Sequence, residues 1–185
     1  MSLGLFVEGK SDKDSIPQLI RKLLDPSPGI VPRTIHRGEM FNPQKVKPYL
    51  EALLKQHQDI EKVIVCVDSE CTNPEEIREE ASKAERTLDE MGFQVKYAVA
   101  VHALEGWLAA DSRALERVLG RQVQINRNLE EVCRPAEFLA GIFAQHGKDF
   151  RKTRHDPLIA RHADPNKIAE RSPSFRRFCE LVRDP

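Results

Sequence analysis

Two short acidic motifs hold residues whose types and spacing suit metal chemistry. Glu8 is followed by Gly9 in the segment FVEGKSD, and Asp68 and Glu70 are separated by one residue in VIVCVDSE. Each motif directly follows an apolar run, so each is expected at the end of a buried strand. Carboxylates that share one crevice repel one another, and a hard cation such as Mg²⁺ relieves the repulsion because it prefers oxygen ligands. The two motifs therefore predict a divalent-metal site.

The surrounding pattern predicts the elements that bring these motifs together. Apolar runs at residues 3–7, 30–35, 62–68 and 93–99 are expected to be strands, and helical periodicity separates them. The run at 62–68 is continuous and β-branched, which is typical of a central strand, whereas Pro32 marks an edge strand. Such alternation implies parallel strands whose carboxyl ends form a ligand crevice. We predict an α/β fold, with an open, mainly parallel four-stranded sheet, helices on both faces and a C-terminal helical lobe.

The last third of the chain carries helical patterns without a further clear strand. The 185 residues suffice for one buried core and a small appended lobe. We expect an α/β core over residues 1–111 and a helical extension, packed on it, over residues 112–185. Helices are expected over residues 12–24, 43–56, 74–91, 105–119, 135–146, 157–163 and 174–182.

Composition is that of a folded protein, and the charge is unevenly distributed. Hydrophobic residues make up 40% and charged residues 31%, which is too apolar for a disordered chain. Lys+Arg and Asp+Glu both number 29, so no basic excess by itself indicates a nucleic-acid binder. Residues 59–92 hold 11 acidic and 4 basic residues, whereas residues 147–183 hold 10 basic and 5 acidic ones. This asymmetry suits a phosphorylated substrate, although charge blocks are more often solvated helix faces.

The cysteines and the N-terminus indicate a cytoplasmic protein. Cys66, Cys71, Cys133 and Cys179 show no C-x-x-C spacing, so neither a zinc site nor a disulfide framework is expected, and the thiols should be reduced. The first residues lack the basic and long apolar regions of a signal peptide. No apolar run is long enough to span a bilayer, so we expect no membrane association.

The acidic motifs also resemble a known family. An E-G after the first strand and a D-x-D-like pair after a later strand resemble the toprim domain of topoisomerases, primases, recombination-repair proteins and overcoming-lysogenization-defect (OLD) nucleases. This resemblance covers residues 3–111. The segments VEGKSDKDSIPQLIRKLL, HALEGWLAAD, FRKTRHDPLIA and SPSFRRFCELV resemble, over nearly the whole chain, a stand-alone bacterial toprim-like family of unknown function. The pair in this chain reads D-S-E, so its second ligand sits on a longer arm than in D-x-D.

The resemblance implies roles for the motif residues. Glu8 would be the general acid and base of phosphoryl transfer and would also touch the metal, while Asp68 and Glu70 would hold Mg²⁺ or Mn²⁺. Gly9 would let backbone or substrate approach closely. A metal that bridges substrate oxygens neutralises developing charge, and a nearby carboxylate can move a proton, so these roles are physically consistent. The alternative for Glu8 is a surface glutamate that caps the following helix.

The segment HALEGWLAAD holds a second group of candidates. The family places acidic residues here, and Glu105 at the start of a helix could reach the crevice and join the metal site. Asp111 is expected to cap the next helix instead. Trp107 is expected to anchor the core of the helical lobe, with stacking on a nucleobase as the alternative.

Basic residues of the tail are candidates for phosphate contacts. Lys152 is predicted to meet a phosphate or a transition-state charge, with Arg151 and Arg154 beside it as substrate-phosphate contacts. Solvated surface is the equal alternative for each. Lys10 is a further phosphate candidate, but the G-x-x-x-x-G-K-[ST] pattern is missing, so a Walker A site is excluded. Three histidines rank below the acids as metal ligands because no H-x-x-x-H pair occurs: His36, His102 and His155.

Three functional hypotheses follow. The first is a Mg²⁺-dependent toprim-type phosphoryl-transfer enzyme, most simply a nuclease acting on DNA or RNA. OLD-like relatives combine a toprim domain with an ATPase, and this chain has no ATPase motif, so the resemblance implies a separately encoded ATPase partner. The second is a catalytically inactive metal- or nucleic-acid-binding regulatory module, which the D-S-E pair and the neutral net charge favour. The third is a receiver domain with Asp68 as phosphoacceptor, which the E-G turn and the helical third oppose.

Overall fold

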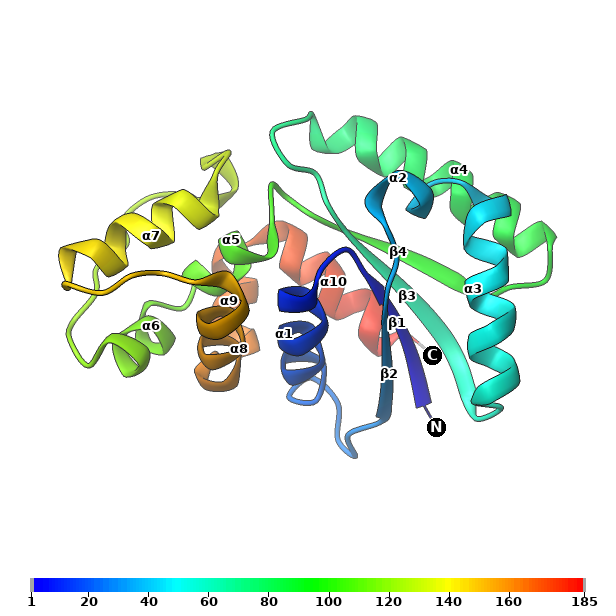
Figure 1. Cartoon of the computed structure of the whole chain (residues 1–185), viewed down its shortest axis with the longest axis horizontal. Helices are drawn as coiled ribbons and strands as arrows, with labels where there is room; N and C mark the ends of the chain where they lie inside the picture. The colour runs from blue at the N-terminus through cyan, green and yellow to red at the C-terminus, as the bar shows by residue number, and fades with distance from the viewer. Residues whose placement is uncertain (1, 185) are drawn as a thin grey trace.

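The computed structural model describes residues 2–184 and shows an α/β architecture (Figure 1). Its sheet has four parallel strands in the order β2-β1-β3-β4. The predicted fold class is therefore confirmed, and each predicted strand is present close to its expected bounds. The strands are β1 (Ser2–Val7), β2 (Gly29–Thr34), β3 (Ile60–Asp68) and β4 (Val95–Ala100).

β3 is an internal strand and β2 an edge strand, both as predicted. β3 pairs with β1 on one side and with β4 on the other. Its side chains alternate between two cores, with Val63 and Val65 in one and Ile64 and Cys66 in the other. A strand covered on both faces needs an uninterrupted apolar sequence, which explains why this run carries the strongest strand signal.

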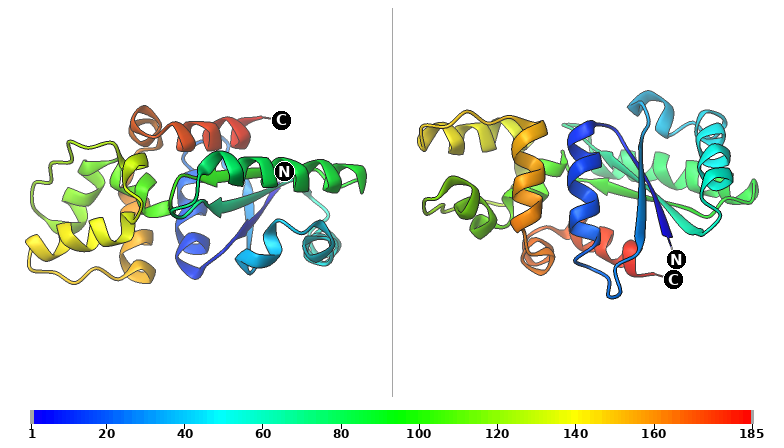
Figure 2. Two further views of the ribbon diagram at one scale, coloured as in Figure 1. Left: turned by 90° about the horizontal axis from the view of Figure 1, so that it is seen from above. Right: turned by 60° about the horizontal axis from the view of Figure 1, so that its bottom comes forward.

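Helices cover both faces of the sheet. The helices α1 (Lys10–Ile20) and α10 (Pro173–Arg183) share a core with one face, and α3 (Pro43–Gln56) and α4 (Pro74–Glu90) share a core with the other. Figure 2 shows this layering. Within residues 2–184 no helix is long and apolar enough to cross a membrane. The remaining helical elements are α2 (Arg37–Met40), α5 (Leu104–Ala109), α6 (Ser112–Leu119), η1 (Leu129–Glu131), α7 (Pro135–Gln145), α8 (Lys152–His162) and α9 (Pro165–Arg171).

The helix expected over 105–119 is broken at Asp111. Its side chain accepts hydrogen bonds from the backbone N–H groups of Arg113 at 3.1 Å and Ala114 at 3.4 Å, which confirms the predicted cap. Its second oxygen accepts from the Asp164 N–H at 2.8 Å. One aspartate thus starts α6 and ties α9 to it, and α5 remains a short helix that points its first turn toward the sheet.

The prediction that a helix begins at Pro157 is wrong. Helix α8 starts at Lys152 and contains Pro157 in its interior. Proline lacks one amide donor, so the helix loses a single backbone hydrogen bond there and continues. The earlier start matters because it places Lys152 and Asp156 one turn apart on the same helix.

The last third of the chain is joined to the sheet by α1 and α10. Lys22, just after α1, donates from Nζ to the carbonyls of Ala160 at 2.9 Å, Arg161 at 2.8 Å and Ala163 at 2.7 Å, and so caps the C-terminal end of α8. The core on this face of the sheet continues without interruption into α5 to α9. One of the two hydrophobic cores therefore serves both a face of the sheet and most of the helical region.

Two cysteines form a disulfide, which corrects the expectation of four reduced thiols. Cys71, after β3, is bonded to Cys133, before α7, with their Cα atoms 5.1 Å apart. Cys66 and Cys179 are free and buried. The pair was missed because 62 residues separate its members and only the tertiary fold brings them together.

Trp107 anchors the core, as predicted. Its side chain is 1% exposed, and its indole Nε1 donates to Ser174 Oγ at 2.8 Å. The ring packs against Phe175 and Phe178 with ring centroids 5.1 Å apart in each pair. This burial excludes nucleobase stacking in the folded state.

Replacing this residue, Trp107→Ala, is expected to lower the free energy of unfolding by about 3–5 kcal/mol, because a large buried aromatic side chain is removed. Urea unfolding followed by circular dichroism measures the change. Leu158→Ala is the control, since the Leu158 side chain is 37% exposed, and it should cost less than about 1 kcal/mol. Equal losses in the two variants would contradict the assignment of Trp107 to the core.

Candidate functional site

Glu8 and Asp68 lie together at the carboxyl ends of β1 and β3. Glu8 Oε1 accepts a hydrogen bond from the Asp68 backbone N–H at 3.0 Å. The same oxygen is 2.8 Å from Nη1 of Arg37, and this guanidinium also donates to the Asp68 backbone carbonyl. One arginine therefore fixes two strand ends. The sequence analysis did not predict Arg37 as a site residue. The only sequence signal for it was its position shortly after the second predicted strand.

Gly9 forms the turn from β1 into α1. Its backbone is extended, and its N–H donates to Oδ2 of Asp12 at 2.9 Å. A Cβ at Gly9 would lie 3.2 Å from that oxygen, so a larger residue would crowd the carboxylate. Asp12 is a second site residue that the sequence analysis did not predict. The sequence signal for it was the G-x-x-D spacing at a helix start, where the side chain of the third helical residue accepts a hydrogen bond from the N–H of the N-cap residue.

Glu105 is buried beside Lys152. The glutamate is 1% exposed and lies in the first turn of α5, and its Oε1 is 2.6 Å from Lys152 Nζ. Burial lowers the pKa of Lys152, but the hydrogen bond and charge of Glu105 raise it more, so the ammonium stays protonated. Among residues 2–184 the second oxygen, Glu105 Oε2, has no hydrogen-bond partner. The structure thus brings together two residues that the sequence placed in separate groups.

Asp156 enters from α8 and is fully buried. Ser11 Oγ donates to its Oδ2 at 2.5 Å and also lies 3.3 Å from the Lys152 carbonyl, which joins α1 to α8. In the described part of the chain, Asp156 Oδ1 has no hydrogen-bond partner. Neither residue was expected, although an aspartate on the apolar side of a helix pattern in RHDPLIA is an unusual feature.

Burial and mutual repulsion change the acidity of these carboxyl groups. Burial raises the pKa of Asp68 well above its ordinary value, and the charges of Asp12 and Glu8 raise it further. Burial also raises the pKa of Asp12 to about 6 and that of Asp156 to about 8. Lys152 lowers all three values without offsetting the rise. Burial is the main cause of these shifts, and the neighbouring carboxylates add to it.

We call this group the acidic cluster, and its carboxylates outnumber the cations that meet them. Arg37 and Lys152 are the cations paired with it. Five ionised carboxylates and two cations would leave an excess of negative charge, which protons or a divalent cation can balance. The cluster consists of Glu8, Asp12, Asp68, Glu105 and Asp156.

The donor set of the acidic cluster fits a hard cation in its chemistry. Carboxylate oxygens are the ligands that Mg²⁺ prefers, and the unpartnered oxygens of Glu105 and Asp156 are available to it. Across residues 2–184, no three His, Cys, Asp or Glu side chains converge as ligands of one ion. Side chains would therefore have to turn toward an ion on binding.

Glu70 lies apart from the acidic cluster. Its side chain is exposed, and its backbone has φ of 51°, in the left-handed region. Its N–H donates to the His102 carbonyl at 2.8 Å, so the chain turns here to follow the segment after β4. The expectation that Asp68 and Glu70 point to the same side assumed an extended backbone, and this turn breaks the alternation.

Basic candidates surround the start of α8. Arg151 is the N-cap of α8 and Arg154 lies in its first turn, so both are next to Lys152. Both are exposed and line a cavity of 390 Å³ that also includes Lys148. Lys10 is exposed at the first position of α1. These side chains are placed at the rim rather than inside the acidic cluster.

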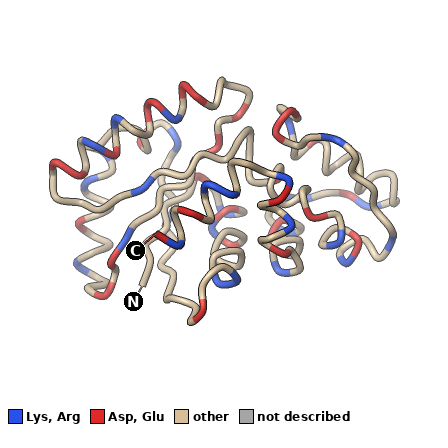
Figure 3. Tube along the Cα trace, turned by 180° about the vertical axis from the view of Figure 1, so that it is seen from behind, with Lys and Arg blue, Asp and Glu red and all other residues tan. Residues whose placement is uncertain are grey.

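Most of the acidic excess in residues 59–92 belongs to an exposed helix. Figure 3 shows acidic and basic residues mixed along α4. Of this segment, Asp68 alone is part of the acidic cluster as defined above. Most of the other charged residues of this segment therefore lie on a solvent-exposed helix face, which was the alternative interpretation of the charge block.

The protein is an α/β domain with acidic residues at the carboxyl edge of its sheet, and its fold is similar to that of the C-terminal region of OLD proteins. The C-terminal region of the Burkholderia pseudomallei OLD protein has a TM-score of 0.52 at 16% identity, with 98% of this chain and 96% of that chain covered. The C-terminal region of the Xanthomonas campestris pv. campestris OLD protein has a TM-score of 0.43 at 17% identity, with 97% and 96% covered. The first comparison shows a shared fold.

The chain belongs to the family described as "Domain of unknown function (DUF4276)", whose model matches residues 7–183. No curated protein matches it. The matched range includes every residue of the acidic cluster and also α8, so the family is defined over the sheet and the helical region together.

The raised pKa values predict that the metal-free protein loses stability as the pH rises. The folded chain keeps protons on Asp12 and Asp156 at pH values where the unfolded chain has released them. Their contribution is full below the ordinary value of 3.8 and is lost as pH passes about 6 for Asp12 and about 8 for Asp156. Each group lowers the free energy of unfolding by up to about 1.4 kcal/mol per pH unit within its window.

Urea unfolding in EDTA between pH 5 and pH 8 tests this expectation. Asp156→Asn keeps an acceptor for Ser11 and cannot titrate, so its stability should depend less on pH than that of the wild type. Parallel pH profiles for the two proteins would show that Asp156 does not hold the proton.

Proposed function

We propose that the protein is a Mg²⁺- or Mn²⁺-dependent phosphoryl-transfer enzyme that hydrolyses phosphodiester bonds of DNA or RNA. The observation that carries the proposal is the acidic cluster itself, in which five buried or half-buried carboxylates exceed the two cations beside them at the carboxyl edge of a parallel sheet. A buried charge excess of this kind is costly unless a cation completes it. The toprim resemblance and the fold shared with an OLD C-terminal region support the same reading.

Asp68 and Glu105 are the proposed metal ligands, with Glu8 at the edge of the metal site. Asp12 and Asp156 supply negative charge around them. Glu70 remains the ligand that the motif implies, and its loop would have to turn inward to reach the ion. A bound divalent metal neutralises charge on phosphate oxygens and lowers the pKa of bound water.

The chain's own residues have complementary tasks in the proposed reaction. Glu8 Oε1 is held by two donors, which leaves Oε2 to accept the proton of the water that attacks phosphorus. The phosphorus–oxygen bond to the leaving strand breaks, that oxygen takes up a proton from solvent water, and Glu8 returns the proton it accepted to the solvent. Lys152 is proposed to stabilise charge on the phosphate, since its ammonium lies at the cluster and half of its side chain is exposed.

The rim residues Lys10, Arg151 and Arg154 are proposed to bind neighbouring phosphates of the nucleic acid. They are exposed, and in the chain Lys10 follows Gly9, Arg151 precedes Lys152 and Arg154 lies two residues after it. Phosphate contacts of this kind position a strand without reading its bases. We further propose a cytoplasmic setting, and the OLD resemblance implies a separately encoded ATPase partner. In the proposed division, residues 1–111 supply the strand-end acids and residues 112–185 supply Lys152.

A second candidate is a regulatory module that binds metal or nucleic acid without chemistry. The observation that favours it is the outward position of Glu70, which leaves the D-S-E pair divided. Metal binding without cleavage of any nucleic acid would support this alternative.

Cleavage of labelled single- and double-stranded DNA and RNA is expected with Mg²⁺ or Mn²⁺ and should stop in EDTA. Glu8→Gln and Asp68→Asn should each lower the rate by about 10²–10⁴-fold, because each removes a carboxylate from the reacting centre. Glu76→Gln, on the exposed face of α4, is the control and should retain the wild-type rate. Cleavage that survives both site variants would assign the activity to another site or to a contaminant.

Metal binding is tested separately from activity. Isothermal titration calorimetry with Mn²⁺ is expected to show binding that falls at least about tenfold in Asp68→Asn and Glu105→Gln, since each loses an anionic ligand. Glu76→Gln should bind as the wild type does. Glu70→Gln decides between the two ligand sets, because a matching loss of affinity in this variant would mean that the loop turns inward.

A further inference from the structure

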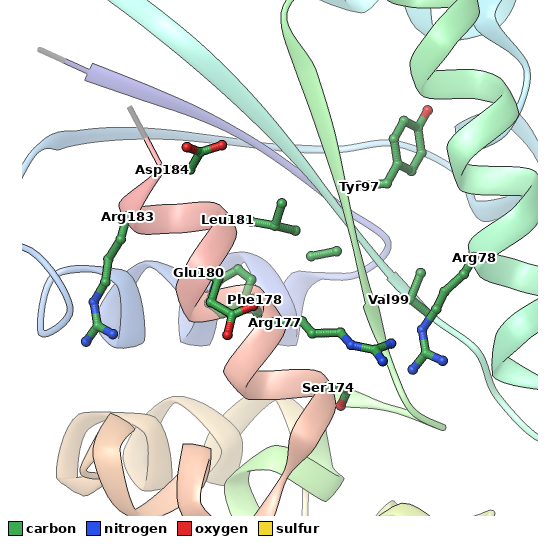
Figure 4. A pocket seen from close by; sticks show the side chains of 11 residues that line it. Arg78, Tyr97, Val99, Ser174, Arg177, Phe178, Glu180, Leu181, Arg183 and Asp184 are labelled. Carbon is green, nitrogen blue, oxygen red and sulfur yellow. The ribbon is translucent and has the colours of Figure 1, made fainter.

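A cavity lies at the edge of the sheet, away from the acidic cluster. It has a volume of 710 Å³ and is lined by residues of β4 and α10, with Arg78 of α4 at one side (Figure 4). No member of the acidic cluster lines it. We call it the β4 groove. Its two walls are the helices that cover opposite faces of the sheet, so the groove opens along the strand edge between them.

The backbone of β4 presents unused hydrogen-bonding groups to this groove. Gln94 and Ala100 direct their carbonyls to Val63 and Ser69, on the β3 side. Because backbone groups alternate along a strand, Tyr97 and Val99 must point theirs away from β3. In agreement, the Tyr97 N–H donates a hydrogen bond to Glu85 Oε2 at 3.3 Å, outside the sheet.

The open edge is limited to a short stretch. Beyond Val99, the next outward N–H is that of Val101, and Ser174 Oγ accepts it at 3.4 Å. Between the two side-chain caps, the Tyr97 carbonyl and both backbone groups of Val99 face the groove. An edge with free donors and acceptors is a template for another strand.

The walls add an apolar surface and charged side chains, with Glu180 and Arg183 farther along α10 than Arg177 and Asp184 at its C-cap. Phe178 and Leu181 of α10 line the groove together with Val99. Arg177 also lines it, and within residues 2–184 its guanidinium has no hydrogen-bond or salt-bridge partner, whereas Arg78 is paired with Glu75. Figure 4 shows Arg78 and Arg177 directed toward the same end of the groove.

Helix α10 is held rigidly beside the edge. Lys62 Nζ donates to the Leu181 carbonyl at 2.8 Å, to the Val182 carbonyl at 3.4 Å and to that of Asp184, and so caps the helix from β3. Phe178 and Cys179 are buried in the core beneath it. The groove is therefore formed before any ligand arrives, which lowers the entropic cost of binding.

We infer that the β4 groove binds an extended peptide segment that adds a strand to β4, places apolar side chains against Leu181 and Val99 and pairs a carboxylate with Arg177. Main-chain groups of the edge require a main-chain partner, which a peptide supplies and a nucleic acid does not. The unpaired guanidinium fits a carboxylate by charge and by its forked geometry. The partner is thus a protein with an extended acidic-apolar segment.

A second copy of this chain fits the groove less well than a lone segment. The edge of another sheet would bring its own flanking helices, which would meet α4 and α10 at the two walls. A single extended segment has no such layers and can enter between them. The occupant is therefore a peptide, and self-association is an outcome that the experiment detects.

The test uses an array of fluorescein-labelled hexapeptides that alternate threonine with varied apolar residues and end in glutamate with a free carboxylate. Fluorescence anisotropy with the full chain is expected to find binders with Kd below about 1 mM. The best binder should lose at least about tenfold in affinity when its glutamate and terminus are amidated, and also when its alternate backbone amides are N-methylated. No binder in the array would overturn the inference.

Two variants locate the binding site. Arg177→Glu should weaken the best peptide at least about tenfold, while Arg161→Glu, which changes an exposed arginine of α8 by the same charge, should leave its affinity unchanged. Hydrogen exchange of the Val99 amide should slow when peptide is added, whereas the Ala98 amide is already protected by β3. Unchanged exchange at Val99, or binding that depends on a dimer in light scattering, would overturn the inference. None of these readouts requires nuclease activity.

Discussion

The structure depends on the compensation of buried and half-buried carboxyl groups that gather at the carboxyl edge of its sheet. Carboxylates from β1, α1, β3, α5 and α8 meet there, and burial raises the pKa of Asp68, Asp12 and Asp156. Such a group is tolerated only if cations or protons compensate it, and Arg37 and Lys152 supply part of the compensation. Each of these ion pairs ties a helix, α2 or α8, to the acidic cluster.

The sheet and most of its helices could be predicted because their signals are local. The β-branched run of β3 and the Asp111 cap each depend on residues close together in sequence. Arg37 and Asp156 could not be predicted in the same way, since their role comes from segments that meet only in the folded chain. The shared orientation expected of Asp68 and Glu70 failed because a left-handed turn replaced an extended backbone.

The two surfaces inferred for this protein belong to adjacent strands. β3 ends in Asp68 of the acidic cluster, and in the sheet Asp68 pairs with Ala100 of β4, next to Val99 of the β4 groove. The groove and the cluster have no lining residue in common, because one lies along the edge of the sheet and the other at its end. Chemistry and partner recognition can therefore be separated by mutation even though one strand pair supports both.

The Lys22 cap has a consequence for how this protein can be inherited and rearranged. An ammonium from the N-terminal third fixes the end of α8, while the other end of the same helix delivers Lys152 to Glu105. A gene fragment that encoded only the sheet would carry the carboxylates without their ammonium counter-charge. Exchanging the sheet alone for that of another protein would therefore remove both the Lys22 cap of α8 and the partners of Lys152.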